Sequence, residues 1–471
     1  MSELASHALA GGLWAAAVHY AAAAGNQALE LYANTEAAAH FTRALSVLET
    51  HPGLVEPAQF ESLLIQRARA LIVLSETAEA LHSLEQARAS ARSRKDVRAE
   101  AEATHWLGLA HWAAWTPSRA LPHARRALAL AKQLNDQHLV GRAHAFLTNP
   151  HGSLGYLDEA LRHAAHALAI YKQLGEEPPA MVLYRIGIIR HQRSEEIAAL
   201  KALQQGEALA LAQHDETILV FVRWVRATAL ANLGRYHEAF AALAAAASSG
   251  KGEEAFARSR IPNTYGAFYA DLGLWHEALE HDLESLEVTQ SMSGPAFKEP
   301  LIHALLNVAE DHLALGAPER AIQAIERVVQ LMPEAEYARF RYGNRLHYVR
   351  ALLALAREEE AAALEAADAC LADAAAYQAP KYEVRGRLVK GRALARLGNA
   401  EVVKTELIAA ARLAEQLGYP AWAWRAWTAA ADVTRVPFIA KHAADAVLRV
   451  ADNLDAGLRE RFLRIAAKAW H

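Results

Sequence analysis

The chain has 471 residues, of which 53% are hydrophobic and only 7% aromatic, so its apolar content is largely alanine and leucine. Runs of Val, Ile and Thr of the kind that strands need are few, so the composition excludes a sheet protein and predicts an all-α chain. The formal net charge of −4 gives no overall attraction to nucleic acid or anionic lipid, and we expect neither as a direct partner.

Cysteine usage and hydropathy indicate the compartment. Cys370 is the single cysteine, which excludes an intramolecular disulfide and a thiolate zinc cluster and fits a reducing environment. No stretch approaches the roughly 18 uninterrupted apolar residues that suggest a membrane span. The N-terminus also lacks the basic and apolar segments of an export signal. We therefore expect a cytoplasmic protein.

One phrase recurs along the chain at intervals of about 39 to 43 residues, which is the signature of a repeat array. It centres on a small anchoring residue near the start of a helix. Its closest copies are "LGYLDEAL" (Leu154 to Leu161), "LGRYHEAF" (Leu233 to Phe240) and "LGLWHEAL" (Leu272 to Leu279), and more degenerate copies include "LSETAEAL" (Leu74 to Leu81) and "LGAPERAI" (Leu315 to Ile322). The anchors are Ala37, Ala80, Ala120, Ala160, Ala199, Ala239, Ala278, Ala321, Ala361 or Ala362, and Val403.

Each part of the phrase has a physical role in a helical hairpin. Leu-Gly ends one helix with a left-handed cap, the polar residues after it start the next helix, and the anchor allows close helix approach. Twelve residues before the anchor a glycine often recurs, where the two helices would cross. These glycines are Gly25, Gly108, Gly187, Gly266 and Gly391.

The pattern of small and aromatic positions resembles that of tetratricopeptide (TPR) repeats, and the segment Tyr265 to Leu286 carries it most fully. The family's usual period is about 34 residues, so the surplus implies longer helices or loops. The resemblance implies a right-handed superhelical α-solenoid of about ten hairpins with a period near 40 residues. The first helix of each hairpin would line its concave face.

The opening segment, Leu4 to Leu48, begins as though part-way through a repeat. It resembles the C-terminal repeat arm of large bacterial signalling ATPases, which are fused to cyclase, kinase or DNA-binding domains. We therefore expect residues 1–471 to form one solenoid, with entry repeats over 1–60, regular repeats over 61–415 and capping helices over 416–471. An N-terminal ATPase portion of the same polypeptide would be a partner.

Each candidate motif for catalysis or metal binding lacks the residue spacing or the number of ligands that its chemistry requires. The histidines of "HEALEH" (His276 to His281) are five apart, about 140° around a helix, and cannot share a metal. His163 and His166 are three apart on a second helix and could touch one ion, but the pattern offers no third ligand. We expect no metal, no cofactor and no catalytic residue.

Proline interrupts one first helix, in "FLTNPHGSLGYLDEAL" (Phe146 to Leu161). Pro150 removes a backbone donor and disfavours helical geometry at Asn149, so we expect the helix to break or kink about one turn before its usual end. Asn149 and His151 would then border the groove. The interruption is either a kink without function or a polar notch for a ligand.

The repeat register predicts which side chains face the concave groove, where a protein or peptide would bind. Aromatic and Arg anchors are typical of such grooves. The alternative is that Trp112, Tyr184 and Trp224 only pack between neighbouring helices. The predicted groove residues are Glu102, His105, Trp112, Arg142, Asn149, Tyr184, His191, Trp224, Asn263 and His303, with Glu310 and Arg385 further along.

A second aromatic patch, Trp422, Trp424 and Trp427, cannot lie on one helical face. It indicates either core packing alone or a terminal hairpin that also meets a partner or a further repeat.

These observations predict a non-catalytic protein- or peptide-binding scaffold, acting as the sensor or interaction arm of an ATPase-coupled bacterial signalling or transcription regulator. One alternative is a stand-alone regulator that responds to a peptide or small effector. The other is an enzyme with its site in the groove, for which Glu102, His105 and His191 are the acid and base candidates.

Overall fold

The computed structural model describes residues 1–248, 254–292, 297–398 and 400–468, and its regular elements in these ranges are all helices, which confirms the predicted class. Among the described residues, no helix is long and apolar enough to cross a membrane. The chain divides into two compact units, Met1–Pro178 and Pro179–His471. The repeat pattern gave no sign of this division.

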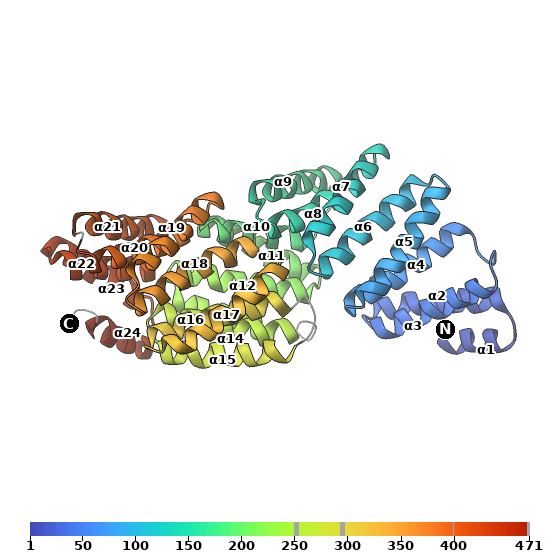
Figure 1. The fold of residues 1–471 in the computed structure, drawn as a ribbon. Coiled ribbons are helices and arrows are strands. Elements are labelled where there is room, and N and C mark those ends of the chain that lie inside the picture. The colour runs from blue at the N-terminus through green and yellow to red at the C-terminus, as the bar shows by residue number, and fades with distance from the viewer. Residues whose placement is uncertain (249–253, 293–296, 399, 469–471) are drawn as a thin grey trace. The chain divides into compact units, whose positions relative to one another are not determined.

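Unit 1 holds one short helix followed by four antiparallel hairpins (Figure 1). Its helices are α1 (Ser2–Ala10), α2 (Trp14–Glu30), α3 (Asn34–Thr50), α4 (Pro57–Val73), α5 (Thr77–Ser93), α6 (Val97–Ala113), α7 (Pro117–Gln133), α8 (Gln137–Ser153) and α9 (Leu157–Leu174). Second helices begin at Thr77, Pro117 and Leu157, at intervals of forty residues.

Unit 2 continues the same alternation of first and second helices and ends in α24. Its elements are α10 (Ala180–Gln192), α11 (Glu196–Ala212), α12 (Glu216–Asn232), α13 (Tyr236–Ala247), α14 (Glu254–Asp271), α15 (Trp275–Ser291), α16 (Lys298–Ala314), α17 (Pro318–Leu331), the 3-10 turn η2 (Met332–Glu334), α18 (Arg339–Ala356), α19 (Glu360–Ala376), α20 (Pro380–Arg396), α21 (Ala400–Leu417), α22 (Pro420–Thr434), α23 (Pro437–Ala451) and α24 (Ala456–Lys468).

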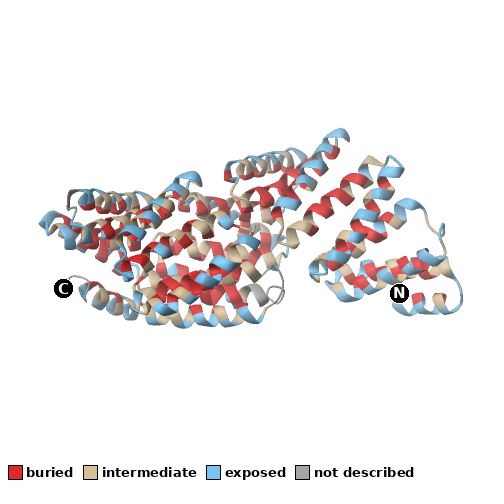
Figure 2. Cartoon of the chain, in the orientation of Figure 1, coloured by how far each residue is buried: buried red, intermediate tan, exposed pale blue. Residues whose placement is uncertain are grey.

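Two kinds of contact hold each unit together. Each helix packs on the next one in the chain, and in addition the first helices pack on one another, as in α4 with α6 and α16 with α18. Because first helices approach each other closely, they form the inner layer and the second helices form the outer one. Figure 2 shows the result as buried residues along the facing sides of the helices and exposed residues along the outer sides.

All but one of the predicted anchors are buried as the pattern predicts. The anchors from Ala37 to Ala321 and Val403 are fully buried; in the repeat of α19 the buried residue is Ala363, whereas the predicted Ala361 and Ala362 are exposed. A Cβ at Gly187 would lie 2.5 Å from the Leu203 side chain, so the helices cross too closely for any larger residue. Packing at these crossings supplies the core that one hairpin lacks.

The predicted break at Pro150 is wrong. α8 runs without interruption to Ser153, with Pro150 inside it. Pro150 and its neighbours Asn149 and His151 are buried, so packing on both sides holds the helical geometry that proline disfavours. His151 uses its Nδ1 to donate to the Leu147 carbonyl oxygen at 2.9 Å.

The C-terminal helices of unit 2 return to its beginning. The Tyr419 hydroxyl, just before α22, donates to Glu196 Oε1 of α11 at 2.6 Å, across 223 positions of sequence. Arg461 of α24 forms an ion pair with Glu277 of α15. The C-terminal segment of unit 2 is therefore tied to the second helix of its first hairpin and to α15.

The tryptophan patch is part of this packing. Trp422, Trp424 and Trp427 are all buried. Trp424 meets Phe462 of α24 edge-on at 5.5 Å, and Trp427 stacks on His442 of α23 at 4.7 Å. The three rings point to different helices, which explains why they need no common face.

Candidate ligand-binding groove

A cavity of about 150 Å³ lies among the first helices of unit 2 and opens to solvent. Its lining comes from α10, α12, α14, α16, α18, α20 and α22, with one side chain from the second helix α15. An adjoining hollow shares Glu310 and Arg425 with it and continues along α16 to α22. We call the two together the unit 2 groove.

Six of the predicted groove residues line this cavity: His191, Trp224, Asn263, His303, Glu310 and Arg385. Trp224 is held in place by its indole Nε1, which donates to Thr264 Oγ1 at 2.8 Å. His303 Nδ1 lies 2.8 Å from a guanidinium nitrogen of Arg260, and burial holds its pKa well below the usual value. His303 is therefore a neutral acceptor.

Tyr184 belongs to the first helix α10. It is buried, and its ring packs 5.5 Å from that of Phe221. Burial raises the pKa of Tyr184 well above its ordinary range, so its hydroxyl stays protonated. The packing interpretation holds for this residue, which does not line the cavity described above.

The predicted groove residues of unit 1 make a separate set of contacts. Glu102 of α6 and Arg142 of α8 form an ion pair across neighbouring first helices, and Glu102 also accepts from Trp106 Nε1 at 2.9 Å. His105 is buried edge-on against Phe146 at 5.4 Å, and burial lowers its pKa to about 3. These side chains hold α6 against α8.

Trp112 and Asn149, also in unit 1, are packing residues. Trp112 packs against the small core cluster that contains Leu121 and Phe146. Asn149 is buried inside α8, and its Oδ1 has no hydrogen-bond partner. Asn149 is therefore out of reach of a ligand without rearrangement, whereas Trp112 is half-buried.

A buried acidic cluster on the wall of the unit 2 groove was missed by the sequence prediction. Asp282 Oδ1 accepts from Asn263 Nδ2 at 2.7 Å and from Asn307 Nδ2 at 2.8 Å. Asp311 lies beside Asp282. Burial raises the pKa of Asp282. The pKa of Asp311 is raised mainly by burial and further by the neighbouring carboxyl of Asp282. The pair therefore holds a proton at neutral pH.

The repeat itself contains the signal that could have revealed Asp282. It lies four residues after the anchor Ala278, where the other repeats carry apolar residues. Gly266 faces it, and a Cβ there would lie 2.4 Å from the carboxylate, so this crossing accommodates an acid that reaches the groove. The equivalent residues are Phe41, Leu84, Ala124, Ala164, Leu203, Leu243, Ile325, Ala367 and Leu407.

Cationic side chains of α18, α20 and α22 also line the cavity. Arg385 lies among aromatic rings, with its guanidinium 4.3 Å from the Trp422 ring centre and 5.3 Å from that of Tyr348. Its Nε has no hydrogen-bond partner among the described residues, and neither has Nε of Arg345. Unpaired buried donors are costly, and a ligand acceptor would satisfy them.

The charges of the lining leave a positive excess. Five cationic side chains face four acidic ones, and two of the acids are the proton-holding pair. The cations are Arg341, Arg345, Lys381, Arg385 and Arg425. A groove with this balance, aromatic surfaces and unpaired donors is suited to a ligand that carries an anionic group.

A buried ion pair braces the floor of the groove. Arg260 of α14 pairs with Glu299 of α16, and both side chains are almost fully buried. Arg341 and the Tyr342 hydroxyl reach the same carboxylate. Burial raises the pKa of Glu299 to about 7, because desolvation outweighs its cationic neighbours. Three consecutive first helices are linked at this point.

The acid and base candidates of the enzyme alternative all have structural partners. Glu102 is engaged by Arg142 and Trp106, and His105 is neutral inside the inner layer. His191 Nδ1 lies 2.9 Å from Glu196 Oε2, the carboxylate that also accepts from Tyr419. Each of these side chains is therefore occupied in holding helices together.

Comparison with known proteins supports the fold. No family model matches the chain, and no curated protein matches it. Among solved structures, it is similar to a Rap protein complexed with competence and sporulation factor (TM-score 0.51, 13% identity, covering 84% of this chain and 100% of that one).

Two structures of the quorum sensor NprR are also similar. The apo form from B. thuringiensis has a TM-score of 0.53 at 12% identity, over 76% of this chain and 99% of that one. NprR in complex with its cognate peptide NprX has a TM-score of 0.52 at 12% identity, over 69% and 92%. The likeness confirms a TPR-like helical repeat fold, with eleven hairpins from α2–α3 to α22–α23 among the described residues. The handedness of the superhelix and the resemblance to ATPase arms stay predictions.

Proposed function

We propose that the chain is a non-catalytic regulator that binds a short peptide in the unit 2 groove. The observation that carries the proposal is the groove lining, which combines ring surfaces, buried amides and an excess of cations on one inner layer. The similar NprR is known in complex with a peptide, which supports the same ligand class here. A free C-terminal carboxylate or an acidic side chain would meet Arg385.

Binding would act through the inner layer. A peptide that contacts α12, α16 and α20 together stabilises one spacing of the first helices over others. Because hairpins contact mainly their neighbours, that spacing is a soft degree of freedom. The closure by Tyr419 and Glu196 makes the two ends of unit 2 respond together. An output partner would recognise the resulting outer surface.

The sensor arm of an ATPase-coupled regulator is a narrower version of this function. It rests on the opening segment, Leu4 to Leu48, and assigns the output to an ATPase portion of the same polypeptide. Peptide binding by the groove is required in both versions, so the groove is tested first.

The test uses the purified full chain and two pools of random short peptides that differ only at the C-terminus, which is a free carboxylate in one and an amide in the other. Retained peptides are identified by mass spectrometry after gel filtration. We expect retention of peptides with a free carboxylate or acidic residues, and loss of retention in Lys381→Gln. Equal retention of both pools without enrichment of acidic peptides, or no retention, contradicts the proposal.

A further inference from the structure

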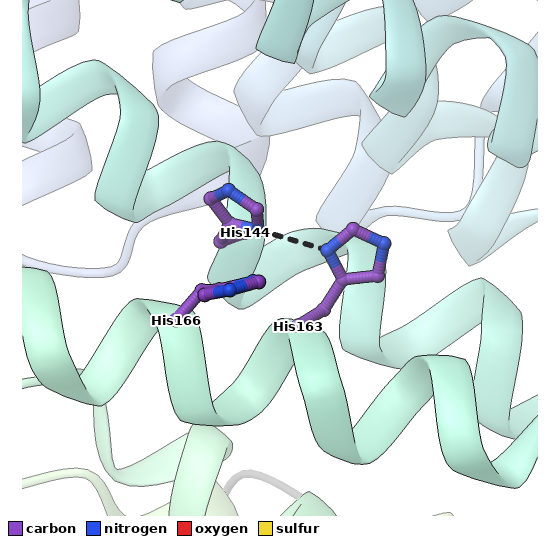
Figure 3. A group of neighbouring side chains, drawn as sticks. All are labelled: His144, His163 and His166. Carbon is purple, nitrogen blue, oxygen red and sulfur yellow. Dashed lines mark hydrogen bonds between the residues drawn. The ribbon is translucent and has the colours of Figure 1, made fainter.

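Three histidines of unit 1 converge on one point between α8 and α9 (Figure 3). His144 projects from α8, and His163 and His166 project from α9. The Nδ1 atoms of His144 and His163 are 2.8 Å apart, and one ligand atom from each of the three rings lies within 4.8 Å of the others. The sequence prediction found His163 and His166 but missed His144, because it lies on the preceding helix.

The repeat shows which of these histidines are part of the scaffold. His151 and His163 stack at 4.9 Å, and forty residues earlier His111 and His123 stack at 5.2 Å in the equivalent place. A stacked histidine pair is therefore a shared feature of the two hairpins and needs no ligand.

The other two histidines are specific to the α8–α9 hairpin. The residues forty positions before His144 and His166 are Thr104 and Arg126. The two additional imidazoles are the ones that surround His163. The α8–α9 hairpin therefore carries two imidazoles at positions where the α6–α7 hairpin carries the Thr104 hydroxyl and the Arg126 guanidinium.

The fourth nearby ring, His151, is already engaged. Its Nδ1 lies 2.9 Å from the Leu147 carbonyl oxygen, and its Nε2 lies 3.4 Å from a guanidinium nitrogen of Arg125. Donation to the carbonyl places the proton on Nδ1 and leaves Nε2 to accept from Arg125. His151 packs on the face of His163 and orients it, in the way that outer groups orient metal-binding imidazoles.

We propose that His144, His163 and His166 bind one transition-metal ion, with Zn²⁺ as the ion that the donor set fits best. Three neutral imidazoles without a thiolate suit Zn²⁺, Cu²⁺ or Ni²⁺, whereas Ca²⁺ and Mg²⁺ require oxygen ligands. Zn–N bonds of about 2.0–2.1 Å in a tetrahedron place nitrogens about 3.3 Å apart. The His144 and His163 nitrogens, 2.8 Å apart, lie within about half an ångström of that value, and the exposed His166 is free to adjust.

The surroundings define the rest of the site. His144 is buried and His163 is half-buried, whereas His166 is exposed, so two of the three rings lie inside the hairpin. Three protein ligands leave a fourth position open, on the solvent side with His166. Lys132 and Arg162 add positive charge nearby, which favours an anion at that position. The bound ion would tie α8 to α9.

Titration of the full chain with Zn²⁺ alone tests the site. A competing chelator masks the weak binding of the scattered surface histidines. We expect one tight equivalent in the wild type and a loss of affinity of about 100-fold or more in His166→Ala, since even outer-shell changes cost 10–100-fold. His166 is exposed, so this variant retains the fold, which circular dichroism checks.

The matched control is His123→Ala in the α6–α7 hairpin, which removes a histidine from the equivalent stack and should leave the tight equivalent intact. A wild type without a tight equivalent, or a His166→Ala variant that binds Zn²⁺ as the wild type does, overturns the proposal. With Co²⁺ as the probe, the wild type should show the visible absorption of four-coordinate cobalt and His144→Ala should not. The result is independent of peptide binding in unit 2.

Discussion

Units 1 and 2 are built from the same hairpin, yet they use their inner faces differently. In unit 1 the inner ion pair Glu102–Arg142 is about one-third exposed, and it joins neighbouring first helices only. In unit 2 the pair Arg260–Glu299 is almost fully buried beside a cavity, and contacts such as Tyr419–Glu196 join distant helices. The repeat therefore supplies the scaffold, and the residues that depart from it supply the groove.

The largest effect should come from breaking the buried pair of unit 2. Arg260→Ala leaves Glu299 buried with fewer cationic partners, and loss of one member of a buried pair costs about 3–5 kcal/mol. Arg142→Ala in unit 1 breaks a pair that solvent screens, at a cost of about 1 kcal/mol or less. Urea unfolding measures both. Equal losses would remove the distinction between the two inner faces.

The second prediction concerns pH. Because folding raises the pKa of Asp282 and Asp311, the native state holds protons that the unfolded state releases, and their stabilising effect is lost as the pH rises above about 4 and through the folded pKa values. Asp311→Asn should therefore raise the free energy of unfolding at pH 8 by about 2 kcal/mol and flatten its fall with pH.

Glu102 of unit 1 should show the opposite pH dependence of the free energy of unfolding, because folding lowers its pKa. Burial alone would raise its pKa, but hydrogen bonds and charge from Arg142 outweigh burial and lower it. Its contribution is therefore present above the unfolded pKa and is lost as the pH falls. Glu102→Gln should lower stability at neutral pH and leave it unchanged in acid. If Asp311→Asn and Glu102→Gln changed the pH dependence of stability in the same direction, the opposite pKa shifts assigned to the two carboxyls would be contradicted.

A smaller effect is expected from opening the closure of unit 2. Tyr419→Phe removes the hydroxyl that donates to Glu196, while Asn232 and His191 still engage that carboxylate. The cost should be about 1–2 kcal/mol. Amide hydrogen exchange should accelerate in α22 and remain unchanged in unit 1. Unchanged exchange in α22 would show that other contacts hold the closure.

Much of the fold could be predicted because the repeat fixes helix ends and crossings through local chemistry. Leu-Gly caps and small anchors specify a hairpin within a few residues, and Gly187 opposite Leu203 shows why. The error at Pro150 has a physical cause. The low helix propensity of proline predicted a break in the helix at Pro150, but packing on the neighbouring helices keeps α8 continuous.

The groove was harder to predict. The register placed His191, Trp224 and Asn263 on first helices, where they line the cavity, but it did not separate lining residues from buried ones such as Tyr184. Asp282 was detectable as a polar residue at an apolar position of the repeat. The contact between Tyr419 and Glu196 was not, because no local pattern relates side chains 223 positions apart.

The central claim is that ligand binding belongs to the inner face of unit 2, and one comparison of affinities tests it most directly. The dissociation constant of a selected acidic peptide is measured by fluorescence anisotropy for the wild type, Arg385→Gln and Arg142→Gln. The account predicts that Arg385→Gln weakens binding at least tenfold, about 1.4 kcal/mol, whereas Arg142→Gln leaves it unchanged. Loss of binding in Arg142→Gln with wild-type affinity in Arg385→Gln would contradict it.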